Sequence, residues 1–180
     1  SGAGSLRSAI ESANTTVGAD SIVFDITSNE GAGPHTITPL SALPTITDAV
    51  TINGFTETGA SANTLAIGGD AVMQIVIDGS SAGAAVDGLR VSGATSSGTI
   101  ISGLVINNFS RHGLSIENTD AVTVSGNYIG VNAAGNTGVG NTGNGIRIDN
   151  STDVTIGGTT PANRNVISAN SLNGIDVLGS

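Results

Sequence analysis

One four-residue pattern occurs four times from residue 88 onward and constrains the fold more than any other feature. It reads glycine, apolar, polar, apolar, and it occupies residues 88–91, 113–116, 145–148 and 174–177. Successive copies start 25, 32 and 29 residues apart. Apolar–polar alternation is typical of a short strand with one buried face. Its return at such intervals predicts a repeat protein in which each unit stacks on the next.

Each repeat holds two further short apolar segments. They occupy residues 98–103, 122–126 and 154–158 at one position, and 104–107, 127–130 and 165–168 at the other. Three strands per repeat, separated by Gly, Asn, Ser and Thr, can wind so that each strand pairs with its copy one coil later, at a rise of about 4.8 Å. We therefore predict an all-β fold, a right-handed parallel β-helix with three short strands per coil.

A β-propeller is the main alternative architecture. Its antiparallel blades need hairpin turns, about four strands per repeat and more aromatic residues. This chain has three strands per repeat and only 2% aromatic residues, which favours the solenoid. Stacked coils would also place Asn127 and Asn165 at matched corners, where asparagine side chains can hydrogen-bond along the stack.

Alternation in the glycine strands separates a buried row from an exposed one. The residues expected to point inward are Leu89, Val91, Leu114, Ile116, Ile146, Ile148, Ile175 and Val177. The row expected to point outward contains Arg90, Ser115, Arg147 and Asp176, with Glu117 and Asp149 in the next row. We expect Arg147 to lie close to Glu117 and Asp176.

The charged members of this face are the candidate ligand-binding residues. They are Arg90, Glu117, Arg147, Asp149 and Asp176. Such a face could grip carbohydrate, and solvated pairs of opposite charge are the simpler interpretation. Glu117 and Asp149 would lie about one rung apart, but no third acid joins them. We therefore predict no catalytic residue, metal or cofactor, and we assign His35 and His112 to surface or corner roles.

Composition limits the partners and the compartment. The net charge is −9, the five basic residues are all arginine, and cysteine is absent. This acidity argues against nucleic acid and anionic membranes as partners. The chain also lacks an apolar run of the roughly 20 residues that a membrane span requires, so we predict no membrane insertion.

The chain reads as one domain, residues 1–180, in three parts. Residues 1–20 form an N-terminal cap containing a helix over residues 5–14, with Ser5 as N-cap and Val17–Gly18 as its stop. Residues 21–87 form irregular first coils, and residues 88–180 form regular coils. Two stretches without clear period, 55–72 and 131–144, are expected to be excursions from the coils.

Several stretches resemble a known family. They are residues 4–10, 13–14, 18–24, 34–38, 42–48 and 50–54, followed by 103–107, 126–130, 156–160 and 164–168. These stretches resemble the CSLREA-type N-terminal domain and the parallel β-helix repeats of bacterial surface proteins. Gly4 and Ser8 replace the leading cysteine and the glutamate of that motif. The resemblance implies a secreted or surface-anchored protein and carries over no catalytic residue.

These observations predict a non-catalytic structural or adhesive β-solenoid, extracellular or at the cell surface. A coil begins at residue 174 and no cap follows it. We therefore expect that rung to be covered by more of the same chain, in a larger surface protein, or by another subunit, in a filament. The alternative function is a carbohydrate-binding or polysaccharide-cleaving β-helix.

Overall fold

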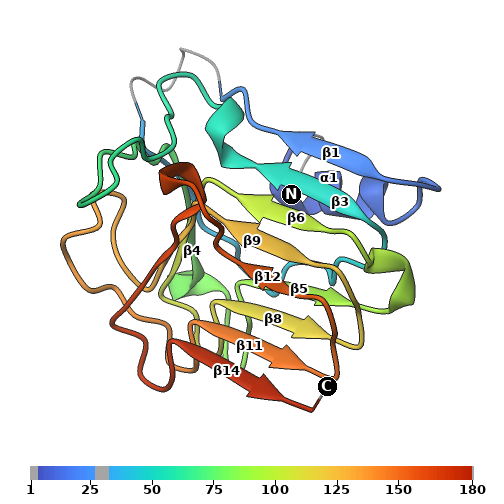
Figure 1. The fold of residues 1–180 in the computed structure, drawn as a ribbon. Coiled ribbons are helices and arrows are strands. Elements are labelled where there is room, and N and C mark those ends of the chain that lie inside the picture. Colours follow the sequence, from blue (N-terminus) through green and yellow to red (C-terminus); the bar gives the residue numbers. More distant parts are fainter. Residues whose placement is uncertain (1–3, 27–32, 180) are drawn as a thin grey trace.

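The protein consists mostly of short parallel strands with one α-helix. The computed structural model describes residues 4–26 and 33–179, and every pairing between its named strands is parallel. The strands form three sheets (Figure 1). The parallel sheets and the helix confirm the predicted fold class at this level, and they contradict the antiparallel blades of a propeller.

The strands have the following bounds. The first sheet contains β1 (Asp20–Val23), β3 (Val50–Asn53), β6 (Ile100–Ser102), β9 (Thr123–Ser125) and β12 (Thr155–Ile156). The second contains β2 (His35–Ile37), β4 (Ile75–Asp78), β7 (Leu104–Asn107), β10 (Tyr128–Ile129) and β13 (Val166–Ile167). The third contains β5 (Leu89–Ser92), β8 (Leu114–Glu117), β11 (Ile146–Asp149) and β14 (Ile175–Leu178).

From β3 onward the chain passes through the first, second and third sheets in turn. We call each such passage a rung: β3–β5 is rung 2, β6–β8 rung 3, β9–β11 rung 4 and β12–β14 rung 5. Rung 1 contains β1 and β2, and its third-sheet position is occupied by Ile46, which pairs in parallel with Val91. The sequence analysis did not assign Ile46 to a strand, because a single bridging residue carries no alternation.

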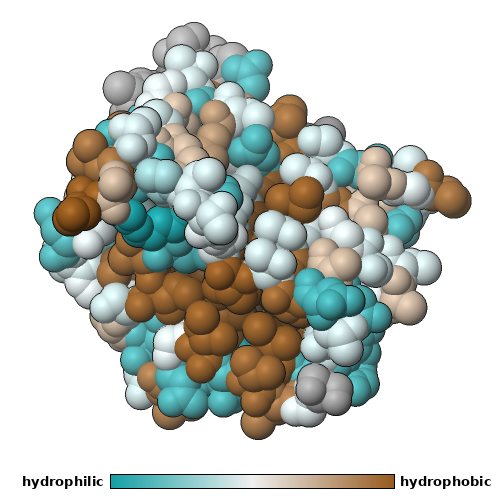
Figure 2. Space-filling model, viewed as in Figure 1, coloured by the Kyte–Doolittle hydropathy of each residue, from teal (hydrophilic) through white to brown (hydrophobic). Residues whose placement is uncertain are grey.

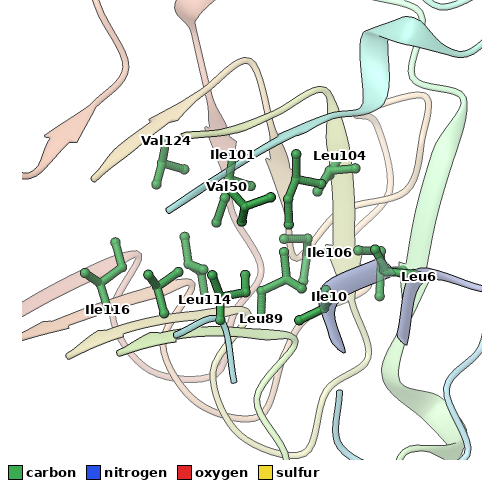
Figure 3. Packing of buried hydrophobic residues seen from close by; sticks show 14 of the residues in the cluster. Leu6, Ile10, Val50, Leu89, Ile101, Leu104, Ile106, Leu114, Ile116 and Val124 are labelled. Atoms are coloured by element: carbon green, nitrogen blue, oxygen red, sulfur yellow. The ribbon is translucent and has the colours of Figure 1, made fainter. Parts of the chain in front are cut away.

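The buried row of the third sheet is aligned as predicted. Leu89, Leu114, Ile146 and Ile175 are successive register partners. Leu89, Leu114 and Ile146 join side chains of the first and second sheets in one aliphatic cluster (Figure 3). Ile175 and Val177 were also expected to be buried, but they are 44% and 61% exposed, because β14 is the edge strand of its sheet. Apolar side chains of this size fill the narrow interior that short strands leave between three sheets.

Helix α1 (Leu6–Ala13) lays its apolar face on this cluster. Leu6, Ile10 and Ala13 are buried. Ser5 caps the helix as predicted, because its hydroxyl accepts the backbone N–H of Ser8 at 3.2 Å. The helix ends at Ala13 with Asn14 as its C-cap, in agreement with the predicted range of residues 5–14. The side chain of Asn14 hydrogen-bonds to the backbone of residues 45 and 47.

Asparagine columns connect successive rungs at the corners. The backbone N–H of Asn127 donates to Oδ1 of Asn165 at 2.9 Å, which confirms the predicted ladder. A second column joins Asn141 to Asn170 in the same manner at 3.2 Å. Each of these asparagines also donates its side-chain amide to a carbonyl of the preceding rung. The corners therefore satisfy backbone groups that the short strands leave unpaired.

The buried column predicts a sharp contrast between two substitutions. Leu114→Ala should lower the free energy of unfolding by about 3 kcal/mol, because its side chain is fully buried between two rungs and leaves a cavity. Ile175→Ala should cost about 1 kcal/mol or less, because Ile175 is 44% exposed in rung 5. Urea unfolding monitored by circular dichroism measures both values. Equal losses would contradict the register.

Candidate functional site on the outer face of the third sheet

The structure brings all five predicted site residues to the outer face of one sheet. Arg90, Ser115, Arg147 and Asp176 are successive register partners, and Glu117 is aligned with Asp149 in the neighbouring row. Both rows were predicted. The placement follows from period-two alternation on strands whose other face is buried.

The ion pairs on this face differ in part from those expected. Arg90 donates to Glu117 at 2.6 Å across rungs 2 and 3. Arg147 pairs instead with Asp149 of its own strand, at 2.8 Å. Asp176 accepts hydrogen bonds from the side-chain amides of Asn144 and Asn173. Since Glu117 and Asp176 already have these partners, Arg147 reaches the carboxylate two residues ahead on the same face.

Glu117 is held in its charged form. Partial burial raises the pKa of its carboxyl, but hydrogen bonds from Ser115 and Arg90 outweigh that effect and lower the pKa overall. A general acid in glycoside hydrolysis needs a raised pKa. Glu117 is therefore suited to holding Arg90 in place and poorly suited to donating a proton.

This face can contact a polar ligand. The side chains of Arg90 and Asp149 are 45% and 37% exposed, and the buried Nε of Arg147 has no hydrogen-bond partner. Guanidinium and carboxylate groups in such rows can bind hydroxyl groups. Among residues 4–26 and 33–179, no three His, Asp or Glu side chains lie close enough together to hold a metal ion.

A second column of polar side chains borders this face, and the sequence analysis missed it. Each member directly precedes one of the four repeated glycines: they are Asp87, His112, Asn144 and Asn173. Each of the first three side chains accepts the backbone N–H of the next member, at 3.1, 3.0 and 2.9 Å. Comparing the residues one place before each glycine would have revealed the column.

His112 occupies a buried corner in this column, where its Nδ1 accepts the N–H of Asn144. A corner role was one of the two predicted for it. Burial lowers the pKa of His112, although Asp87 opposes this effect. Protonation at Nδ1 would turn this acceptor into an N–H donor facing the Asn144 N–H, and the hydrogen bond would be lost. His112 is therefore a structural acceptor in its neutral form.

The other histidine lies elsewhere. His35 begins β2, and its Nε2 is 3.9 Å from Oε1 of the buried Glu57. Glu57 also accepts the backbone N–H of Ile26 at 2.8 Å. This pair belongs to the packing of rungs 1 and 2 and lies on a different sheet from the five candidate residues.

Comparisons with known proteins add no assignment. No family model matches the chain, and no curated protein or solved structure matches it. Within the described residues, no helix combines the length and the apolar character needed to cross a membrane.

The column predicts a pH-dependent stability. Because the pKa of His112 is lower in the folded state, the unfolded chain binds more protons below about pH 6.5. This stabilising contribution is therefore complete above that pH and is lost as the pH falls. His112→Asn keeps an acceptor like those of the next two rungs and should remove this pH dependence. Urea unfolding midpoints measured between pH 5.5 and 7.5 give this pH dependence. If the midpoint falls with decreasing pH as steeply in the variant as in the original chain, the assignment to His112 is wrong.

Proposed function

We propose that this chain is a right-handed parallel β-helix, with three strands per coil, and that it serves as a non-catalytic structural or adhesive scaffold. The observation that carries the proposal is the regular passage of the chain through three parallel sheets, with polar columns at the corners. Repeated backbone pairing of this kind suits a rigid, extendable rod.

The edge formed by β12, β13 and β14 supports this function. Val177 is 61% exposed, and Ile175 and Leu178 are also exposed. Figure 2 shows apolar residues gathered over the region between β12 and β14. Unpaired strand edges and exposed apolar side chains favour the addition of another strand layer. We propose that a further rung, from the same polypeptide or from another subunit, covers this edge.

The corner columns would set the register of such a rung. In rungs 2 to 4, each residue before the repeated glycine accepts an N–H from the next rung. Asn173 occupies the same position in rung 5. A following rung could donate its corresponding N–H to Asn173 Oδ1. Register would therefore depend on the corners as well as on the strands.

An extracellular or cell-surface location remains part of the proposal. Its support is the resemblance of the sequence to the CSLREA-type and β-helix repeat stretches of bacterial surface proteins. A surface scaffold also suits the net charge of −9, because repulsion between like charges opposes non-specific association of neighbouring molecules through their lateral faces.

Self-association through the rung 5 edge provides a direct test. We expect association that increases with protein concentration, followed by light scattering and electron microscopy. Val177→Lys should prevent it, because it places a charge at the exposed edge. Ile100→Lys is the matched control, since Ile100 is an exposed residue on the outer face of the central strand β6. A chain that stays monomeric, or equal effects of both variants, would contradict association through this edge.

The alternative function, carbohydrate binding or cleavage, is favoured by the exposed Arg90 and Asp149 side chains of the third sheet. Incubation with a panel of acidic and neutral polysaccharides separates the two functions. Cleavage, or binding that Arg147→Ala abolishes while Arg7→Ala does not, would support the alternative. The scaffold proposal expects neither.

A further inference from the structure

The connections between the first and second sheets differ greatly in length from rung to rung. In rungs 3 and 4 they are tight, consisting of Gly103 and of residues 126–127. In rung 2 the connection includes residues 55–72, which we call the lateral segment, and in rung 5 it spans residues 157–165. Long connections therefore flank two rungs with short ones (Figure 1).

The lateral segment lies against the two tight corners. A Cβ added to Gly103 would lie 2.8 Å from the Phe55 ring, and one added to Gly126 would lie 2.9 Å from it. A Cβ on Gly126 would also lie 2.9 Å from the carbonyl oxygen of Ala162, which belongs to rung 5. Glycine at both corners thus lets Phe55 pack across rungs 3 and 4 toward rung 5.

The lateral segment is also bonded directly to the rung 5 connection. Arg164 donates to the carbonyl oxygen of Ala66 at 2.7 Å and to that of Gly68. In the other direction, Asn63 donates its side-chain amide to the carbonyl oxygen of Pro161 at 3.2 Å. These bonds join residues 96 to 98 positions apart, and they bypass rungs 3 and 4 entirely.

Beneath these contacts, the second sheet has an apolar outer face. Val76, Val105, Tyr128 and Val166 are successive register partners that point away from the main core. They pack with Met73, Phe55 and Ala71 of the rung 2 connection. Phe55 and Ala71 of the lateral segment therefore share one apolar cluster with a residue from each of rungs 2 to 5, and Val131 and Ala133 complete that cluster.

We propose that the lateral segment is a clamp that fastens rung 5 to rung 2, and that Arg164 is its latch. In a repeat protein each unit contacts only its neighbours, so terminal units can open alone. A direct bond between rungs 2 and 5 makes opening of rung 5 require release of the clamp. Rung 5 is then less able to open on its own, which suits a rod that must resist unfolding from one end.

Hydrogen exchange in the intact chain tests the clamp. Arg164→Met keeps the side-chain stem and removes the bonds to Ala66 and Gly68. The reporters are the amides of Thr155, Gly157, Val166 and Ser168, each bonded to a rung 4 carbonyl. We expect them to exchange about tenfold faster in the variant, as loss of a charge-assisted hydrogen bond allows. Arg90→Met, which breaks a pair between rungs 2 and 3 only, should leave them unchanged.

Two outcomes would overturn the clamp. One is unchanged exchange at the four reporter amides in Arg164→Met. The other concerns the double variant Arg164→Met/Asn63→Ala. If both residues hold one clamp, the first substitution already releases it, and the second should accelerate amide exchange little further. Fully additive effects on the exchange free energy would therefore contradict the clamp. Both variants alter surface or connection residues, so urea unfolding can verify that each one folds.

Discussion

Backbone hydrogen bonding between rungs is the constraint on which the whole structure depends. Within residues 4–26 and 33–179 no strand exceeds four residues, and the named strands pair in parallel with partners one rung away. Residues 89 and 114, the first residues of β5 and β8, are register partners although 25 positions separate them. A single rung therefore lacks both its hydrogen-bond partners and a closed core, and it gains them only from its neighbours.

Side chains at the corners fix the register that such short strands specify poorly. Two to four residues of parallel pairing specify register poorly, because a shifted pairing would keep many of the same backbone bonds. Columns of asparagine, with Asp87 and His112 in one of them, bond position to position and would be broken by a shift. Asn118 and Asn150 add another such contact at 2.7 Å, both with left-handed backbones. The corners therefore define which residues face one another on the charged outer face.

The sequence alone predicted the features that recur. The glycine pattern identified the third-sheet strands and their inward and outward rows, and matched corner positions predicted the pairing of Asn127 with Asn165. It could not predict Ile46, which occurs once, or the choice of Arg147 for Asp149, which depends on how neighbouring side chains are already engaged. It also could not show that residues 55–72 lie along the second sheet, because the hydrogen bonds that hold them there join residues nearly 100 positions apart. The position of the five candidate residues on one outer face was thus predictable, and their pairings were not.

Methyl NMR of the intact chain tests the central claim most directly. With Ile, Leu and Val methyl groups labelled, the stacked rungs predict nuclear Overhauser contacts from Leu89 to Leu114, from Leu114 to Ile146 and from Ile146 to Ile175, because these residues are register partners in parallel strands. Observation of that series would establish one continuous aliphatic column. Its absence, with contacts instead joining residues adjacent across antiparallel hairpins, would contradict the account.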